Sequence, residues 1–229
     1  MEDAVVCKNV TKVFGEGSTR VDALRGVDLE VKRGELLMMM GPSGSGKTTL
    51  ISIIAGILTQ TEGECSVNNL NLNSMPDSMK TEYRGKHIGF VFQQFNLIPM
   101  LTCAENVSIP QVLCGQDRKK ALSDARKLLE DVGISEKADA YPLQLSGGQQ
   151  QRVAIARAIS HDPDLIVCDE PTSYLDHETG VKIMELLRAV AEKKGKTLIV
   201  VSHDVRILKF ADRIVRLEDG KIVPTPPNP

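Results

Sequence analysis

A segment that reads Gly-Pro-Ser-Gly-Ser-Gly-Lys-Thr-Thr could bind phosphate groups, because it matches the pattern G-x-x-x-x-G-K-[ST] in full. Glycines let the backbone curl so that its N–H groups point into one concavity, and the N-terminus of a following helix adds partial positive charge. A lysine at this offset can reach the terminal phosphates, and the next hydroxyl can ligate Mg²⁺. The residues of this phosphate-binding loop are Gly41, Pro42, Ser43, Gly44, Ser45, Gly46, Lys47, Thr48 and Thr49. They predict that the chain binds a nucleoside triphosphate.

The sequence on both sides of the loop supports this interpretation. Residues 36–40 form a continuous apolar run that predicts a buried strand, and residues 50–58 open a predicted helix. A plain glycine-rich turn between a strand and a helix is the alternative. The Lys47-Thr48 pair at the required offset, set between these flanks, favours phosphate binding.

A second segment brings two carboxylates to the end of an apolar run. Residues 165–168 are Leu-Ile-Val-Cys, which is typical of a strand buried on both faces, and Asp169 and Glu170 follow directly. The first carboxylate can position Mg²⁺, and the second can accept a proton from an attacking water. An acidic strand end that faces solvent would need no function, but its presence beside a phosphate-binding loop favours catalysis.

The segment Leu-Ser-Gly-Gly-Gln at 145–149 is the third motif. Ser-Gly-Gly at a helix start also suits a simple N-cap turn. However, the segment resembles the signature sequence of the ATP-binding-cassette (ABC) family, and with the other two motifs and the order of elements the resemblance covers nearly the whole chain. It implies an α/β fold, a P-loop NTPase ABC cassette. Such a cassette has a RecA-like mixed or parallel sheet core, an N-terminal antiparallel β subdomain and an inserted α-helical subdomain.

In this family two cassettes meet head-to-tail, and ATP lies between the phosphate-binding loop of one and the signature of the other. The resemblance therefore implies a second copy of the chain as a partner. Ser146 and Gly148, with a helix N-terminus behind them, would contact the γ-phosphate from across the interface. The signature residues expected at the nucleotide are Ser146, Gly147, Gly148 and Gln149.

Further residues match family motifs one by one. Gln93 matches the Q-loop glutamine, expected to sense Mg²⁺ and the γ-phosphate while it touches a membrane partner. His203 matches the switch histidine that steadies the γ-phosphate and the attacking water, and Asp176 matches the D-loop that couples the two sites. Phe14 occupies the position expected to stack on adenine, although a core residue of a strand is an open alternative. Tyr174 departs from the family, whose D-loop usually has a small residue there.

The resemblance thus implies an ATPase with ATP and Mg²⁺ as cofactors. The expected catalytic residues are Glu170, His203 and Gln93. The expected Mg²⁺ ligands are Thr48, Gln93 and Asp169. A nucleotide-binding enzyme that acts as a monomer, such as a kinase, is disfavoured because it has no use for a γ-phosphate contact supplied by a second subunit.

Residues 93–99 and 145–152 resemble the macrolide-export and lipoprotein-release branch of the family, and residues 203–213 resemble its glycolipid-export relatives. Members of this branch pair with a separate membrane permease and often with a periplasmic adaptor protein, so the partner would set the transported substrate. Importer cassettes of the amino-acid type stay open as an alternative. A non-transport ABC ATPase is less favoured, because residues 95–144 show one clear amphipathic helix and no sustained heptads.

The amino-acid composition limits which binding partners and which cellular compartment we expect for the chain. The chain has 229 residues, 41% of them hydrophobic, and a net charge of −2, which gives no general reason to expect nucleic acid. The five cysteines are scattered without a Cys-x-x-Cys pair, which fits reduced thiols in a cytosolic protein. The N-terminus lacks a secretion signal, and no apolar stretch approaches the roughly 18–20 residues needed to span a bilayer. We expect a cytoplasmic protein that is peripheral on the inner face of the cell membrane through its permease.

Hydrophobic patterning predicts the elements that position these motifs. Strands alternate with helices, which predicts a parallel or mixed sheet. Strands are predicted at 5–14, 27–31, 36–40, 65–67, 88–92, 165–168, 197–201, 214–218 and 221–223. Helices are predicted at 118–132, 149–159, 180–193 and 205–210. We expect residues 1–229 to form a single domain, with a helical subdomain inserted at about 95–151 and a disordered tail at 224–229.

Overall fold

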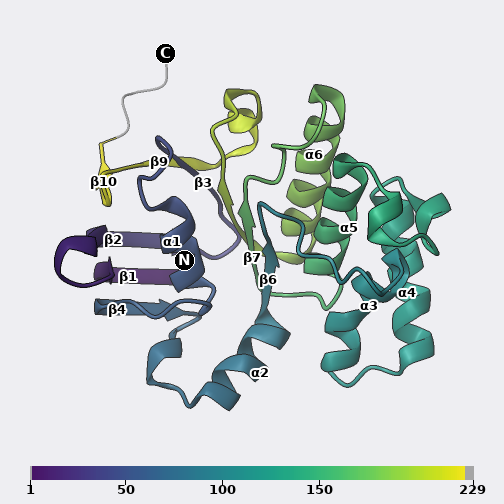
Figure 1. Ribbon diagram of the computed structural model, residues 1–229, viewed down its shortest axis with the longest axis horizontal. Coiled ribbons are helices and arrows are strands. Elements are labelled where there is room, and N and C mark those ends of the chain that lie inside the picture. Colours follow the sequence, from purple (N-terminus) through teal and green to yellow (C-terminus); the bar gives the residue numbers. More distant parts are fainter. Residues whose placement is uncertain (1, 225–229) are drawn as a thin grey trace.

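Two β-sheets flanked by helices make up the computed structural model, which describes residues 2–224 (Figure 1). Of the predicted tail, Pro224 is exposed and outside regular structure. Residues 225–229 lie outside the described residues, so the predicted disorder there stays a prediction.

The first sheet is antiparallel and carries the N-terminus of the chain. Its strand order is β2-β1-β4-β5. The strands are β1 (Asp3–Phe14), β2 (Val21–Lys32), β4 (Glu62–Val67) and β5 (Leu70–Asn71). The predicted strand at 27–31 is the second half of β2, which starts earlier because residues 21–26 complete the ladder with β1.

The second sheet is mostly parallel, in the order β10-β9-β3-β8-β7-β6. Its strands are β3 (Leu36–Met40), β6 (Ile88–Val91), β7 (Leu165–Asp169), β8 (Thr197–Val201), β9 (Arg213–Glu218) and β10 (Lys221–Val223). Only β10 runs antiparallel to its neighbour, through a tight turn in which Asp219 and Gly220 both have positive φ. Every residue of β7 and β8 is buried, as their continuous apolar sequences predict.

The helices confirm the predicted set in part. The α-helices are α1 (Lys47–Ile54), α2 (Asp77–His87), α3 (Cys103–Leu113), α4 (Arg118–Asp131), α5 (Gly147–Ile159) and α6 (His177–Lys194). The 3-10 helices are η1 (Gly17–Thr19), η2 (Leu72–Ser74), η3 (Ser135–Lys137), η4 (Pro142–Gln144) and η5 (Val205–Phe210). The helix predicted at 205–210 is therefore a 3-10 helix.

The sequence prediction missed α2 and α3, each for a physical reason. Helix α2 buries none of its residues, so it lacks the apolar stripe by which amphipathic helices are recognised. Helix α3 contains Pro110 and buries the polar side chains of Asn106, Ser108 and Gln111, so its inward face does not look apolar. Its start carries a capping box between Thr102 and Glu105.

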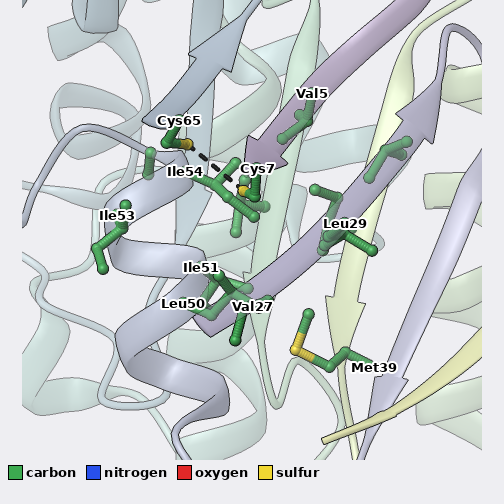
Figure 2. Packing of buried hydrophobic residues seen from close by; sticks show 14 of the residues in the cluster. Val5, Cys7, Val27, Leu29, Met39, Leu50, Ile51, Ile53, Ile54 and Cys65 are labelled. Carbon is green, nitrogen blue, oxygen red and sulfur yellow. Dashed lines mark hydrogen bonds between the residues drawn. The ribbon is translucent and has the colours of Figure 1, made fainter. Parts of the chain in front are cut away.

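Helix α1 fills the space between the two sheets (Figures 1 and 2). Leu50, Ile51 and Ile54 of this helix pack with Val27 of β2 and Met39 of β3 in one buried cluster. The alternate residues of β3, β7 and β8 face a second cluster beneath α5 and α6. The phosphate-binding loop at the start of α1 is thus held by core packing on both sides of the second sheet.

Helices α3 and α4 and the start of α5 form a body of their own. Their side chains pack in a third cluster that includes Val107, Leu129 and Val153. This part of the chain leaves the second sheet after β6 and returns to it at β7. The insertion at about 95–151 and the single domain over residues 1–229 stay predictions.

Candidate active site

The phosphate-binding loop connects the end of β3 to the start of α1 in a conformation that requires glycine. Gly41 and Gly46 have φ of 148° and 101°. A Cβ atom would lie 2.0 Å from the Leu217 carbonyl oxygen at Gly41, and 2.4 Å from the Ala23 carbonyl oxygen at Gly46. Gly46 is the N-cap of α1 and supplies no side-chain cap, so the first N–H groups of the helix stay available for an anion.

Lys47 lies folded over the loop. Its side chain is buried, and Nζ donates hydrogen bonds to the carbonyl oxygens of Gly41 at 2.9 Å and Pro42 at 2.7 Å. Burial lowers the pKa of Lys47, while the nearby charges of Glu170 and Asp169 act in the opposite direction. Because these hydrogen bonds go to neutral carbonyls, the loop holds a cation whose charge can be directed to a phosphate.

Two oxygens suited to a magnesium ion meet across the end of the second sheet. The Thr48 hydroxyl donates a 2.8 Å hydrogen bond to Oδ2 of Asp169, the last residue of β7. Burial is the main cause that raises the pKa of Asp169, and the Thr48 hydrogen bond opposes it. Within residues 2–224 there is no group of three His, Cys, Asp or Glu side chains that could hold a metal. A hydroxyl and one carboxylate instead fit Mg²⁺ that takes its other ligands from phosphate and water.

Glu170 and His203 meet at the ends of neighbouring strands. Oε2 of Glu170, directly after β7, lies 2.9 Å from Nδ1 of His203, which follows β8. The Glu170 backbone has a φ of 51° and donates its N–H to the carbonyl of Val201. Ser173 Oγ donates to the Glu170 carbonyl at 2.6 Å. These contacts hold the carboxylate at the edge of a hollow of about 300 Å³ that His203 and Ser202 also line.

A second hollow, of about 290 Å³, lies over the phosphate-binding loop. Gly44, Gly46, Lys47, Thr48 and Thr49 line it from the loop side. Val21, Arg25, Asp219 and Gly220 are among the residues on its other side. Arg25 and Asp219 are outside the predicted site. Asp219 follows β9, which pairs with β3, and the Arg25 N–H donates to the Gly220 carbonyl, and no local sequence pattern reveals either contact.

Phe14 is the strand neighbour of a residue that lines this second hollow. It pairs with Val21 in the ladder of β1 and β2, and Val21 lines the hollow. The ring is 40% exposed, and Lys12 Nζ lies 5.1 Å from its centroid. The alternative that Phe14 is a core residue of the strand is therefore wrong. Stacking on adenine stays a prediction.

Gln93 lies close to the two carboxylates in the fold. It follows β6 by two residues, and Val91 at the end of β6 pairs with Cys168 of β7, one residue before Asp169. The Gln93 side chain is exposed. Parallel strands present their C-terminal ends at one edge, so this edge gathers Gln93, Asp169, Glu170 and His203.

The signature residues lie elsewhere in the same chain. Ser146 is the N-cap of α5: its Oγ accepts the Gln149 N–H at 3.3 Å, and Gln149 Oε1 accepts the Ser146 N–H at 3.0 Å. Among the described residues that line the two hollows, none belongs to residues 145–149. Gly147 and Gly148 instead pack near Phe95, Tyr174 and Leu175.

Asp176 also stays apart from the hollows. It caps α6 by accepting the Thr179 N–H at 2.9 Å, and this backbone hydrogen bond is the main cause that lowers the pKa of Asp176. The Thr48–Asp169 hydrogen bond joins the phosphate-binding loop to the carboxylates, whereas neither the signature nor Asp176 lines either hollow.

Known proteins share this arrangement over nearly the whole chain. A family model described as ABC transporter matches residues 24–173. An uncharacterized ABC transporter ATP-binding protein of Methanocaldococcus jannaschii, MJ0796, is 46% identical over an alignment of 222 residues, and the match covers 94% of this chain and 93% of that protein. The uncharacterized ABC transporter ATP-binding protein YbbA of Escherichia coli is 43% identical over 221 residues, which are 96% and 97% of the two chains.

Solved structures agree with the sequence relatives. The dimeric structure of a post-hydrolysis state of the ATP-binding cassette MJ0796, bound to ADP and Pi, superposes with a TM-score of 0.92 at 44% identity. The match covers 95% of this chain and 96% of that chain. A second dimeric structure of MJ0796 matches equally well. The expected fold class is thereby confirmed.

Proposed function

This chain belongs to the ABC transporter family, and we propose on that premise that it is the ATP-hydrolysing subunit that powers a separate membrane permease. The family expected from the three sequence motifs is confirmed.

The nucleotide site is proposed to be composite. In one chain, the signature residues 145–149 lie apart from both hollows. Ser146 Oγ caps the Gln149 N–H, and the N–H groups of Gly147 and Gly148 at the start of α5 suit an anion. A second copy of the chain, placed head-to-tail, would bring its signature to the phosphate-binding loop of the first. The related cassette MJ0796 is dimeric in its solved structures, which supports this assembly.

Each residue around the phosphate-binding loop of the first chain then has its own proposed role in ATP hydrolysis. Mg²⁺, when bound by Thr48 and Asp169 with Gln93 close by, supplies charge neutralisation at the phosphates. Lys47 and the free N–H groups of α1 bind the phosphate oxygens. Glu170 takes a proton from the attacking water, and His203 orients that carboxylate.

The partner chain's residues complete the site. Ser146, Gly147, Gly148 and Gln149 are proposed to bind the γ-phosphate from the partner's side through the N-terminus of α5. Asp176, whose carboxylate caps its own helix, is proposed to couple the two sites by fixing the segment 173–176 rather than by touching nucleotide. Phe14 is proposed to stack on the adenine ring.

A mixing experiment tests the composite site. We expect Lys47→Ala and Ser146→Arg variants to be inactive alone, because each homodimer has two damaged sites. An equal mixture forms some heterodimers in which the intact loop of one chain meets the intact signature of the other, so hydrolysis should reappear. If the mixture stays inactive while both variants still form mixed dimers, the composite site is wrong.

We propose that the permease binds in an apolar groove. It encloses about 320 Å³ between α2, β6, α3 and α5, with Phe90 on its floor and Leu113, which is 79% exposed, on its rim. Arg157 also lines the groove and binds the carbonyls of Phe95 and Asn96, two and three residues beyond Gln93. A cytoplasmic helix seated in the groove would therefore be linked to the ATP site through this segment.

None of the helices in residues 2–224 has the length and apolarity to cross a bilayer. In this proposal, the permease spans the membrane. Recovery of the chain with a multi-span membrane protein supports the transport function. Recovery with nucleic acid alone would contradict it. Helices α3 and α4 are 11 and 14 residues long, which is far from the long coiled coils of DNA-structural ABC proteins.

Within the family, we propose the macrolide-export and lipoprotein-release branch. The segments 93–99 and 145–152 support it, and the permease would hold the chain at the cytoplasmic face of the membrane. A periplasmic adaptor, reached through the permease, belongs to this proposal. A four-span permease gene and an adaptor gene beside this one would support the branch, whereas genes for an amino-acid importer would overturn it.

A further inference from the structure

Tyr174 makes a contact that links two separate parts of the site. It lies between Glu170 and the start of α6, and its side chain is 50% exposed. Its ring meets the ring of Phe95 edge-on, with centroids 5.0 Å apart and an interplanar angle of 65°. This is a favourable geometry for two aromatic rings. Phe95 follows Gln93 by two residues, so the contact joins the Gln93 segment to the segment 173–176.

The same two rings border the start of the signature helix. A Cβ atom added to Gly147 would lie 3.6 Å from Phe95 Cζ and 3.8 Å from Tyr174 Cβ. One added to Gly148 would lie 3.2 Å from Leu175 Cδ2 and 3.5 Å from the Tyr174 carbonyl oxygen. At these two positions, the space between the N-terminus of α5 and both segments is thus too small for more than a methyl group.

The signature helix also holds the backbone of the Gln93 segment. Arg157 in the last turn of α5 donates from Nη1 to the Asn96 carbonyl at 2.6 Å and from Nη2 to the Phe95 carbonyl at 2.9 Å. Phe95 is thus fixed to α5 through its main chain and to Tyr174 through its ring. The Gln93 segment, the segment 173–176 and α5 therefore pack together in one chain, although they contact different ATP molecules in the proposed dimer.

We infer that Tyr174 is a positioning residue that, through Phe95, transmits a movement of Gln93 at one ATP to the segments that complete the other ATP site. The inference rests on the proposed composite site. A shift of Gln93 displaces Phe95, and the edge-on ring contact makes Tyr174 follow, because packed side chains move between discrete arrangements rather than deform. The signature and the segment 173–176 then move together toward the partner chain.

The ring, not the hydroxyl, carries this role. The structure records no hydrogen bond of the Tyr174 hydroxyl with any of residues 2–224, whereas the ring has a defined partner. A phenylalanine at this position should therefore keep the function. An aliphatic residue of similar volume should lose it, because it offers no aromatic edge.

The test uses the full chain with Tyr174→Leu, Phe95→Leu, the double variant and Tyr174→Phe. We expect each leucine variant to lower kcat about 2- to 10-fold, the range that one aromatic pair accounts for. The Hill coefficient for ATP should fall toward 1, while the affinity of monomers for ATP stays unchanged. The double variant should match either single one, and Tyr174→Phe should behave as the wild type. Met79→Ala, on exposed α2, is the control.

The inference fails if Tyr174→Phe is as impaired as Tyr174→Leu, if the two single effects multiply in the double variant, or if the Hill coefficient does not change. A purely structural role would lower the melting temperature without changing that coefficient. A wild-type protein that hydrolyses ATP without cooperativity, and whose Lys47→Ala and Ser146→Arg variants do not complement each other, would instead overturn the proposed composite site and this inference with it.

Discussion

Nδ1 of His203 lies 2.9 Å from Oε2 of Glu170, so a histidine that follows β8 restrains the carboxylate that follows β7. A carboxylate is negatively charged and an imidazole is positively charged when protonated, so this contact is an ion pair whenever His203 carries both ring protons. The Glu170 side chain is 17% exposed and that of His203 is 69% exposed. The carboxylate is thus held in a fixed direction at the hollow, while the imidazole stays accessible to nucleotide.

Replacing Glu170 by glutamine should separate binding from hydrolysis. The amide can keep the contact with His203 but cannot take a proton from water, so we expect kcat to fall about 10²- to 10⁴-fold. ATP binding should persist, and ATP should trap a dimer that gel filtration detects. Glu178→Gln is a matched control, because Glu178 is exposed on α6 and pairs with Lys182. Hydrolysis at the wild-type rate would show that Glu170 is not the catalytic base.

Removing His203 should leave Glu170 in place but without its restraint. We expect His203→Ala to lower kcat about 10²-fold, since a misdirected base reaches the attacking water less often. ATP binding, measured by fluorescence titration, should change little. The control is His177→Ala, at the exposed start of α6. If the two histidine variants are equally active, the contact between His203 and Glu170 has no catalytic role.

The replacement of Asp169 by asparagine should change stability and activity in opposite directions. Burial raises the pKa of Asp169 above its ordinary value of 3.8. The charged form of this buried carboxyl therefore lowers the free energy of unfolding. Asparagine can still accept the Thr48 hydrogen bond without that charge. We expect a melting temperature about 2–4 °C higher at neutral pH and loss of Mg²⁺-dependent hydrolysis.

The pH dependence of this stability gain follows from the sign of the shift. Between 3.8 and the raised pKa, the folded state binds more protons than the unfolded state, so wild-type stability falls as pH rises through that window. The advantage of the asparagine variant should therefore grow across the window and stay constant above it. A melting-temperature difference that is independent of pH would contradict this account.

Local sequence predicted the parts of the site that depend on local geometry. Strands β3 and β8 occur at the predicted residues, and Ser146 caps α5 as an N-cap serine does. The phosphate-binding loop was recognisable because glycine, lysine and threonine at fixed offsets specify one conformation. The roles of Gln93 and His203 came only from the family resemblance, because a lone glutamine or histidine has no local signature.

Contacts between segments that are far apart in the sequence could not be predicted from the sequence. The clash that makes Gly41 irreplaceable involves the Leu217 carbonyl, which reaches the loop only because β9 pairs with β3. Tyr174 was identified as unusual, but its contact with Phe95 depends on how the helical insertion packs on the second sheet. Helix α2 was missed because it buries no side chain.

Substitution of Gly46 by alanine should destabilise the protein and remove nucleotide binding. At φ of 101°, a Cβ would meet the Ala23 carbonyl oxygen at 2.4 Å, so the loop and β2 must separate. We expect a loss of about 2–3 kcal/mol in the free energy of unfolding, measured with urea. Gly34→Ala is the control, because Gly34 also has positive φ but nothing within 4 Å. Equal losses of stability in the two variants would show that the positive φ, and not the clash with the Ala23 carbonyl, causes the effect.

A charge on the rim of the groove should uncouple the chain from its permease and leave its own chemistry intact. Leu113 is 79% exposed, so Leu113→Asp creates no buried charge and should keep the melting temperature and the ATPase rate of the isolated protein. Binding to a permease that co-purifies with the wild-type chain, measured after co-expression, should fall at least about 10-fold, because the aspartate would lose its hydration inside an apolar contact. The control is Leu70→Asp, an exposed leucine on β5 away from the groove. Unchanged co-purification of Leu113→Asp, or an equal loss with Leu70→Asp, would place the permease elsewhere on the cassette.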